Sequence, residues 1–203
     1  NVQPGNKGLE AAARDARYAF LESIPGKIAT AHTADDNSET VLMHMIRGTG
    51  LKGLGGISPV RGNVIRPMLT VTRAEVESFL QEYHLSHIED SSNQTDVFLR
   101  NRIRHRLMPL LQEENPKIVE SLTHMALRLR QDEQMLQELT CEPLPAVSEL
   151  RQMPSSILSR YLAVFLQQCG VAEPEAEHIA LARSLVFSEK PSARGDFPGG
   201  VTL

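Results

Sequence analysis

Lys27 to Ile46 reads K-I-A-T-A-H-T-A-D-D-N-S-E-T-V-L-M-H-M-I, and this stretch decides the fold. Its apolar start predicts a buried strand at 27–31, and the apolar residues that follow predict a helix from about 35 to 47. One histidine and three carboxylates gather at the junction of strand and helix: His32, Asp35, Asp36 and Glu39. In an open α/β sheet, ligands bind beyond the carboxyl ends of the strands, so these four residues are candidates for a functional site.

The three acids exceed what the start of a helix requires. A single acid there is explained by the free N–H groups and the dipole of the helix, which favour negative charge. Helical spacing, however, places Asp35 and Glu39 on one side of the helix with Asp36 beside them. The pattern therefore favours a site for a cation or an amine over a solvated helix start.

The order of the predicted elements changes near residue 113. Before it, strand and helix alternate. The predicted elements there are a helix over 9–22, a glycine-rich loop at 48–56, a short strand at 64–69, a capping box at 72–75 and a helix over 99–114. The proline in the 64–69 strand assigns it to a sheet edge. After it no strand pattern appears, and helices are predicted over 116–139, 155–169 and 174–188. We predict an α/β fold with a partial doubly wound parallel sheet in residues 1–112, followed by an all-helical domain in residues 113–203.

The bulk composition excludes several classes of protein. The formal net charge of −4 gives no global sign of nucleic-acid binding, so any such binding must come from local patches. Cys141 and Cys169 lie far apart in the sequence, which argues for a reducing, cytoplasmic location rather than for a disulfide framework or a zinc site. No apolar run approaches the ~20 residues that a membrane span needs.

A second group of charges lies at Arg100 to Arg106, which reads R-N-R-I-R-H-R. On a helix, Arg100 and Arg104 share one face, and the planar guanidinium favours bidentate contacts with phosphate or carboxylate. The alternative is a solvated helix face paired with acids such as Glu113 and Glu114. A smaller basic set occurs at Arg61, Arg66 and Arg73, where a chance placement on loops and edges is the simpler interpretation.

Together these motifs resemble the bacterial tRNA(Ile)-lysidine synthase family. The resemblance rests on six ordered motifs over about residues 9 to 110: E-A-A-A-R-D-A-R-Y-A-F at 10–20, A-H-T-A-D-D-N-S-E-T-V-L at 31–42, R-G-T-G-L-K-G-L at 47–54, I-R-P-M-L at 65–69, E-D-S-S-N at 89–93 and R-N-R-I-R-H at 100–105. The helical part from 113 onwards resembles the domain that follows in this family, without a sharp motif of its own.

The resemblance implies a ligase of the N-type ATP pyrophosphatase (PP-loop) class that modifies tRNA. Such an enzyme uses ATP, normally with Mg2+, to adenylate the C2 oxygen of the wobble cytidine in the CAU-anticodon tRNA(Ile). The ε-amine of free L-lysine then displaces AMP and gives lysidine. The partners implied are therefore tRNA(Ile) and lysine, with no membrane, and a homodimer is a possible assembly.

The resemblance also implies roles for particular residues. Asp36 and Glu39 would hold the ammonium group of lysine, and Arg104 would meet its carboxylate or shape that pocket. His32 would stand beside the reacting groups, Arg17 would approach the ATP phosphates, and the loop 48–56 would line the lysine and nucleotide side. The residues expected to contact tRNA or phosphate are Arg100, Arg102, Arg106 and Lys52. No protein metal ligands are predicted.

The chain departs from the family pattern in one respect. The family opens with a phosphate-binding loop of the form S-G-G-x-D-S, whose backbone N–H groups hold phosphate, and this sequence does not contain it. We therefore expect a fragment that is inactive alone. The alternatives are another N-type pyrophosphatase acting on tRNA, a phosphohydrolase with metal ligands at 32, 35, 36 and 39, or a non-catalytic piece that binds tRNA. The position of both cysteines in the helical half argues against a 2-thiolation enzyme.

Overall fold

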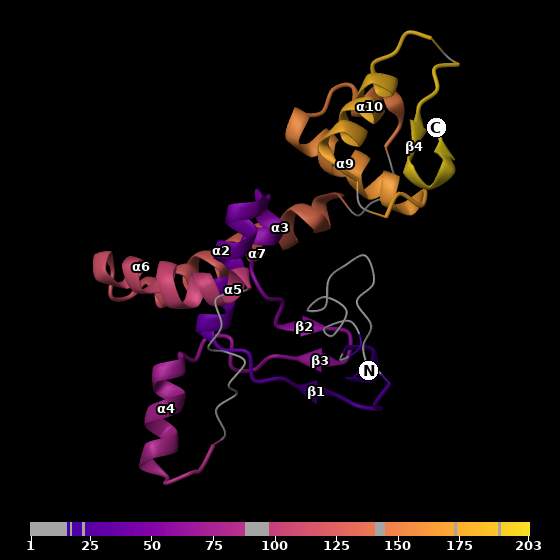
Figure 1. Cartoon of the computed structure of the whole chain (residues 1–203). Coiled ribbons are helices and arrows are strands. Elements are labelled where there is room, and N and C mark those ends of the chain that lie inside the picture. The colour runs from indigo at the N-terminus through magenta and orange to yellow at the C-terminus, as the bar shows by residue number, and fades with distance from the viewer. Residues whose placement is uncertain are drawn as a thin grey trace. The chain divides into compact units, whose positions relative to one another are not determined.

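The computed structural model describes residues 16, 18–21, 23–87, 98–140, 145–172, 174–190 and 192–203. The chain divides into two compact units, Asn1–Gln131 and Asp132–Leu203 (Figure 1). The division falls later than residue 112, because the helices just beyond that residue share a core with the first unit. No helix within the described ranges is long and apolar enough to cross a membrane.

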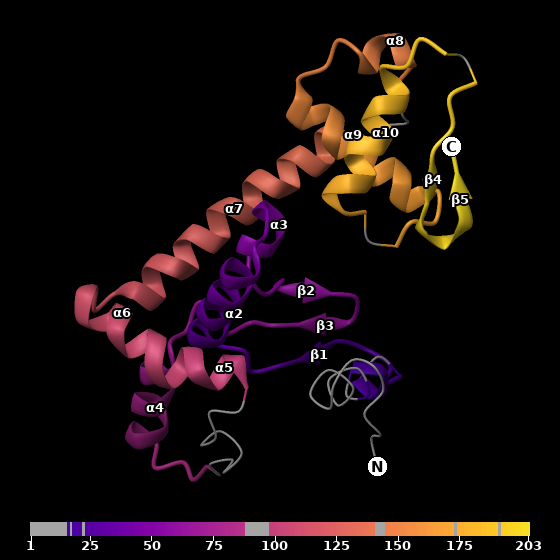
Figure 2. The same cartoon turned by 45° about the horizontal axis from the view of Figure 1, so that its top comes forward.

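The first unit contains a small mixed sheet of three strands, β1 (Ile28–Ala29), β2 (Val60–Arg61) and β3 (Val64–Ile65). The strand order is β1-β3-β2, with β1 parallel to β3 and β2 antiparallel to β3 (Figure 2). The predicted edge position of the 64–69 strand is therefore wrong, since β3 is central. Its proline, Pro67, lies beyond the paired residues and removes no hydrogen bond from the ladder. A parallel pair connected through a helix agrees with the α/β class, and the larger doubly wound sheet stays a prediction.

In the first unit, helices α2 and α3 lie between β1 and β2, and helix α4 follows β3. Helix α2 (Ala34–Arg47) begins at Thr33, which forms a capping box with Asp36, and it ends at Gly48 with a φ of 77°. Part of the predicted glycine-rich loop is a short helix, α3 (Leu51–Leu54). Helix α4 (Arg73–Glu82) begins at the predicted capping box of Thr72 and Glu75, which is confirmed.

The predicted helix over 99–114 is a composite of three parts. Helix α5 (Leu99–Arg102) passes into a π-helical turn (Ile103–Leu107) and then into helix α6 (Met108–Glu114). Pro109 has no N–H to donate to the preceding turn, and a wider turn accommodates that loss. This composite and helix α7 (Ile118–Thr140) pack on α2 through a core of Ala34, Leu42, Ile103, Met108 and Val119.

The second unit has its own core. Helices α8 (Val147–Leu150), α9 (Ser155–Gln168) and α10 (Ala176–Val186) pack around buried side chains that include Leu158, Leu162 and Leu166. An antiparallel pair, β4 (Asp196–Phe197) and β5 (Val201–Thr202), closes the unit and buries Phe197 in that core. The prediction of an all-helical second domain is therefore wrong. Two-residue strands around Gly199 and Gly200, both with positive φ, are too short to show a sequence alternation.

Candidate active site

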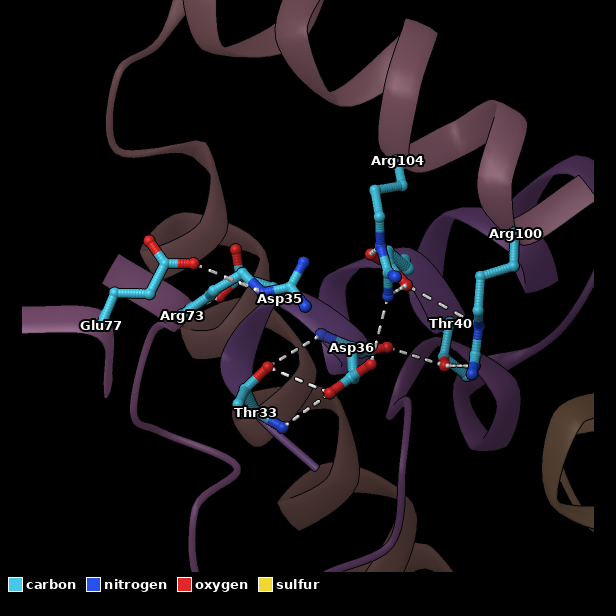
Figure 3. Close-up of polar contacts among 9 residues, drawn as sticks. Thr33, Asp35, Asp36, Thr40, Arg73, Glu77, Arg100 and Arg104 are labelled. Atoms are coloured by element: carbon cyan, nitrogen blue, oxygen red, sulfur yellow. Dashed lines mark hydrogen bonds and ion pairs between the residues drawn. The ribbon is translucent and has the colours of Figure 1, made fainter. Parts of the chain in front are cut away.

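Asp36 lies at the start of α2, where its two carboxylate oxygens have different partners (Figure 3). Its Oδ2 accepts hydrogen bonds from the backbone N–H of Thr33 at 2.9 Å and from the Thr33 hydroxyl at 3.0 Å. Its Oδ1 lies 3.5 Å from Nη2 of Arg104. One oxygen thus fixes the helix start, and the other faces the cationic partner.

Glu39 is buried one turn further along α2 and forms a bidentate pair with Arg104. Nε of Arg104 lies 2.6 Å from Oε1 of Glu39, and its Nη2 lies 2.9 Å from Oε2. The Glu39 side chain is 3% exposed, so this pair is shielded from water and from salt. Two parallel hydrogen bonds of this kind hold a guanidinium in one orientation.

Burial and pairing act in opposite directions on this carboxylate. Burial raises the pKa of Glu39 above its ordinary value, while the hydrogen bonds and the charge of Arg104 lower it in part. The hydrogen bond to Glu39 raises the pKa of Arg104, so the guanidinium stays charged. The permanent positive charge of Arg104 offsets the free-energy cost of burying the Glu39 carboxylate, so Glu39 and Arg104 act as one group.

Arg100 joins the same cluster from α5. Its Nη2 donates to the hydroxyl of Thr40 at 2.8 Å, and its Nε lies 3.7 Å from Oε2 of Glu39. The shared contact of Arg100 and Arg104 with Glu39 agrees with the expectation that they lie on one face. The cluster therefore holds two carboxylates and two guanidiniums at the N-terminal half of α2 (Figure 3).

Asp35 has a different role from its neighbour. Its Oδ2 accepts a hydrogen bond at 2.7 Å from the backbone N–H of Arg73, the first residue of α4. A carboxylate at a helix start is favoured by the free N–H groups and the dipole. The structure thus uses Asp35 to join the start of α4 to the start of α2.

The remaining predicted residues are placed as follows. His32 is half-buried after β1, with its Nδ1 3.0 Å from the hydroxyl of Thr30. Lys52 is exposed on α3, Arg102 is exposed at the end of α5, and Arg106 is exposed in the π-helical turn. Arg17 and the motif at 89–93 lie outside the described residues.

Two threonines of this site, Thr33 and Thr40, were not predicted from the sequence. The Thr33 cap had a local signal, because T-x-x-D just before an apolar run is the capping pattern. Thr40 had none, since its contact with Arg100 joins positions that are distant in the sequence.

The described side chains do not by themselves form a site for Mg2+. Within the part of the chain that the structure describes, no three His, Cys, Asp or Glu side chains gather around a point that could hold a metal ion. Asp36 and Glu39 face guanidinium groups, which would repel a divalent cation. This pairing of both carboxylates with guanidinium groups disfavours the phosphohydrolase alternative.

Comparison with known proteins identifies the family. Residues 1–111 match the model of the PP-loop domain. The chain belongs to the PP-loop family. This agrees with the α/β character of the first unit and with a candidate site beyond the carboxyl end of a parallel strand.

The resemblance drawn from the six motifs is also confirmed. The chain is 34% identical to a tRNA(Ile)-lysidine synthase of Geobacillus kaustophilus over 97% of its length, which covers 47% of that protein. It is 36% identical to the synthase of Geobacter sulfurreducens over 94% of its length and 45% of that protein. For Bacillus subtilis the identity is 35% over 97% of the chain and 48% of the relative. The chain thus spans about half the length of these curated relatives.

Proposed function

We propose that this chain belongs to a tRNA(Ile)-lysidine synthase, which adenylates the C2 oxygen of the wobble cytidine in the CAU-anticodon tRNA(Ile) with ATP and then joins L-lysine to C2. The observation that carries the proposal is the identity of 34% to 36% with curated synthases over almost the whole chain. The charge cluster on α2 supports it, because a free amino acid presents groups of both signs.

Within that function, Asp36 is the direct acceptor for the ammonium group of lysine. Its side chain is 25% exposed, and its Oδ1 lies 3.5 Å from Nη2 of Arg104. Glu39, buried one turn further along α2, adds negative charge and holds Arg104 in place. The Arg104 guanidinium is then oriented for the lysine carboxylate, the anion that its planar fork fits.

His32 is proposed as the proton acceptor of the ligation step. The ε-ammonium group of lysine must lose a proton before its nitrogen lone pair forms the bond to C2. AMP then leaves with the electrons of the C2–O bond. A neutral imidazole nitrogen can accept that proton. The exposed Arg102, Arg106 and Lys52 are proposed to contact tRNA phosphates, and Arg17 to approach the phosphates of ATP.

The test measures lysine incorporation into a tRNA(Ile) transcript with a CAU anticodon. The intact protein is incubated with ATP and labelled lysine, and the wobble nucleoside is identified by mass spectrometry. We expect lysidine, and we expect Asp36→Asn to raise the KM for lysine by about tenfold or more, because a charge-assisted hydrogen bond of about 1.5–3 kcal/mol is lost. Asn keeps an oxygen for the Thr33 cap.

The matched control is Glu113→Gln, which removes an exposed charge on α6. Its KM for lysine should equal that of the wild type. A wild-type protein that binds this tRNA without transferring lysine would refute the proposed function. An Asp36→Asn variant with the wild-type KM would refute the role of Asp36 alone.

A further inference from the structure

Three side chains hold the backbone of the segment Gly53 to Ile57, which follows α2. Oδ1 of Asn37 accepts a hydrogen bond from the N–H of Ile57 at 2.7 Å. Nδ1 of His44 lies 2.7 Å from the carbonyl oxygen of Gly53, and since a carbonyl only accepts, this nitrogen carries the hydrogen. Nη2 of Arg130 donates to the carbonyl of Gly55 and to that of Ile57, the latter at 2.8 Å.

These contacts use polar groups in places where burial is costly. Asn37 is 2% exposed and sits on the face of α2 that packs inward. Arg130, on α7, is half-buried, and burial lowers its pKa because the charged form loses water. A buried polar side chain destabilises the fold unless its hydrogen bonds are made, so each of these groups depends on the loop carbonyls and N–H that it contacts.

The loop also lies too close to α2 for any side chain at residue 56. Gly56 has a φ of 68°, and a Cβ built there would lie 2.3 Å from Oδ1 of Asn37. Glycine at this position lets the backbone approach the helix and allows the Ile57 hydrogen bond to form. The hydrogen bond between Asn37 and Ile57 therefore needs both the Asn37 side-chain amide and a glycine at position 56.

The same helix carries this contact and the charge cluster. Asn37 lies between Asp36 and Glu39 in sequence, and His44 lies further along α2, so the loop is fixed relative to both acids. Both views show α3, whose last two residues begin the held segment, beside α2 (Figures 1 and 2). Arg130 adds an attachment to α7, so the loop is tied to two elements.

We infer that Asn37, His44 and Arg130 are positioning residues that hold Gly53–Ile57 in one conformation and thereby set the affinity of the site for lysine. This inference rests on the proposed function and on the family resemblance, which implies that the loop 48–56 lines the lysine side. A loop held before the substrate arrives loses less conformational freedom on binding, and that difference appears as affinity.

The test compares disruptive and conservative variants in the intact protein. Arg130→Met and His44→Leu remove the donors, whereas Arg130→Lys and His44→Asn keep a donor near the same carbonyl. Arg128→Met is the control, because Arg128 is an exposed arginine on the same helix, α7. Each variant is examined by amide hydrogen exchange of residues 53–57 and by the KM and kcat of lysine transfer to tRNA.

In Arg130→Met and His44→Leu we expect the loop amides to exchange at least about tenfold faster, and the KM for lysine to rise about tenfold with a smaller change in kcat. The conservative variants should recover much of both effects, and Arg128→Met should change neither. Unchanged loop exchange in both disruptive variants would overturn the inference. So would a loosened loop with the KM for lysine unchanged.

The two proposals fail in different ways. If the wild type makes no lysidine, the proposed function and the link to lysine affinity both fall, while the exchange data still decide whether the three side chains hold the loop. If the wild type is active and the loop variants keep its KM, the function stands and the inference falls.

Discussion

Glu39 is a buried carboxylate whose charge is balanced by Arg104 through two hydrogen bonds. Arg104→Met would remove that balance while keeping much of the side-chain volume. We expect the free energy of unfolding to fall by about 3 kcal/mol, the cost of leaving one partner of a buried pair alone. Urea denaturation measures it, and Arg128→Met should change stability by less than about 0.5 kcal/mol.

The same variant should show a pH dependence of defined sign. Burial already raises the pKa of Glu39 in the folded protein, and removing Arg104 takes away the main opposing effect. The folded state then holds more protons than the unfolded state between the ordinary glutamate pKa of about 4.3 and the raised folded value. Stability therefore falls as the pH rises through that window, and the deficit of Arg104→Met should shrink on acidification. A deficit that is the same at pH 5 and pH 7.5 would contradict this.

The individual residues of this cluster could be found in the sequence, but their pairing could not. The spacing of Asp36 and Glu39, and of Arg100 and Arg104, follows from helical periodicity alone. The contact between Glu39 and Arg104 joins positions that are distant in the chain. It depends on how α5 and the π-helical turn pack on α2, which local patterns do not specify.

Helix α4 illustrates an interaction between elements. None of its residues is buried, and its first N–H group is bound by Asp35 of α2. We expect Asp35→Ala to destabilise the start of α4 by about 1 kcal/mol, a typical cost for a lost helix cap, and Asp35→Asn to cost less because an oxygen remains. Amide exchange at Arg73 measures the effect.

Glu77→Ala provides the control for that prediction. Glu77 forms an exposed ion pair with Arg73 at 3.8 Å on the same helix, and such surface pairs contribute little. Its loss should leave the exchange at Arg73 nearly unchanged. Equal effects of Asp35→Ala and Glu77→Ala would mean that the Asp35 contact does not stabilise the helix start.

The elements that the sequence predicted well are those with local signals. The capping box of Thr72 and Glu75 lies within four residues, and the apolar periodicity of α2, α9 and α10 repeats over several turns. β4 and β5 are two residues long each, and the π-helical turn differs from an α-helix by one hydrogen-bond shift. The two short strands and the π-helical turn produce no periodic pattern of apolar residues, so the sequence did not predict them.

For the whole molecule, the two units bury separate sets of side chains. The core of Asp132–Leu203 includes Leu158, which is fully buried, and the core of Asn1–Gln131 includes Leu42. Because each unit has its own core, we expect each to unfold with its own free energy. Leu158→Ala should lower the unfolding free energy of the second unit by about 3 kcal/mol, through lost burial and the cavity left behind.

Native-state amide exchange separates the two outcomes of that prediction. Amides of α9 and α10 should lose protection in Leu158→Ala, while amides of α2 keep theirs, and Leu42→Ala should give the reverse pattern. If either variant lowers the protection of both units equally, the chain unfolds as one cooperative body despite its two cores. A loss of stability in the second unit would then also destabilise the charge cluster on α2, and variants in α9 or α10 would be expected to weaken the proposed lysine transfer as well.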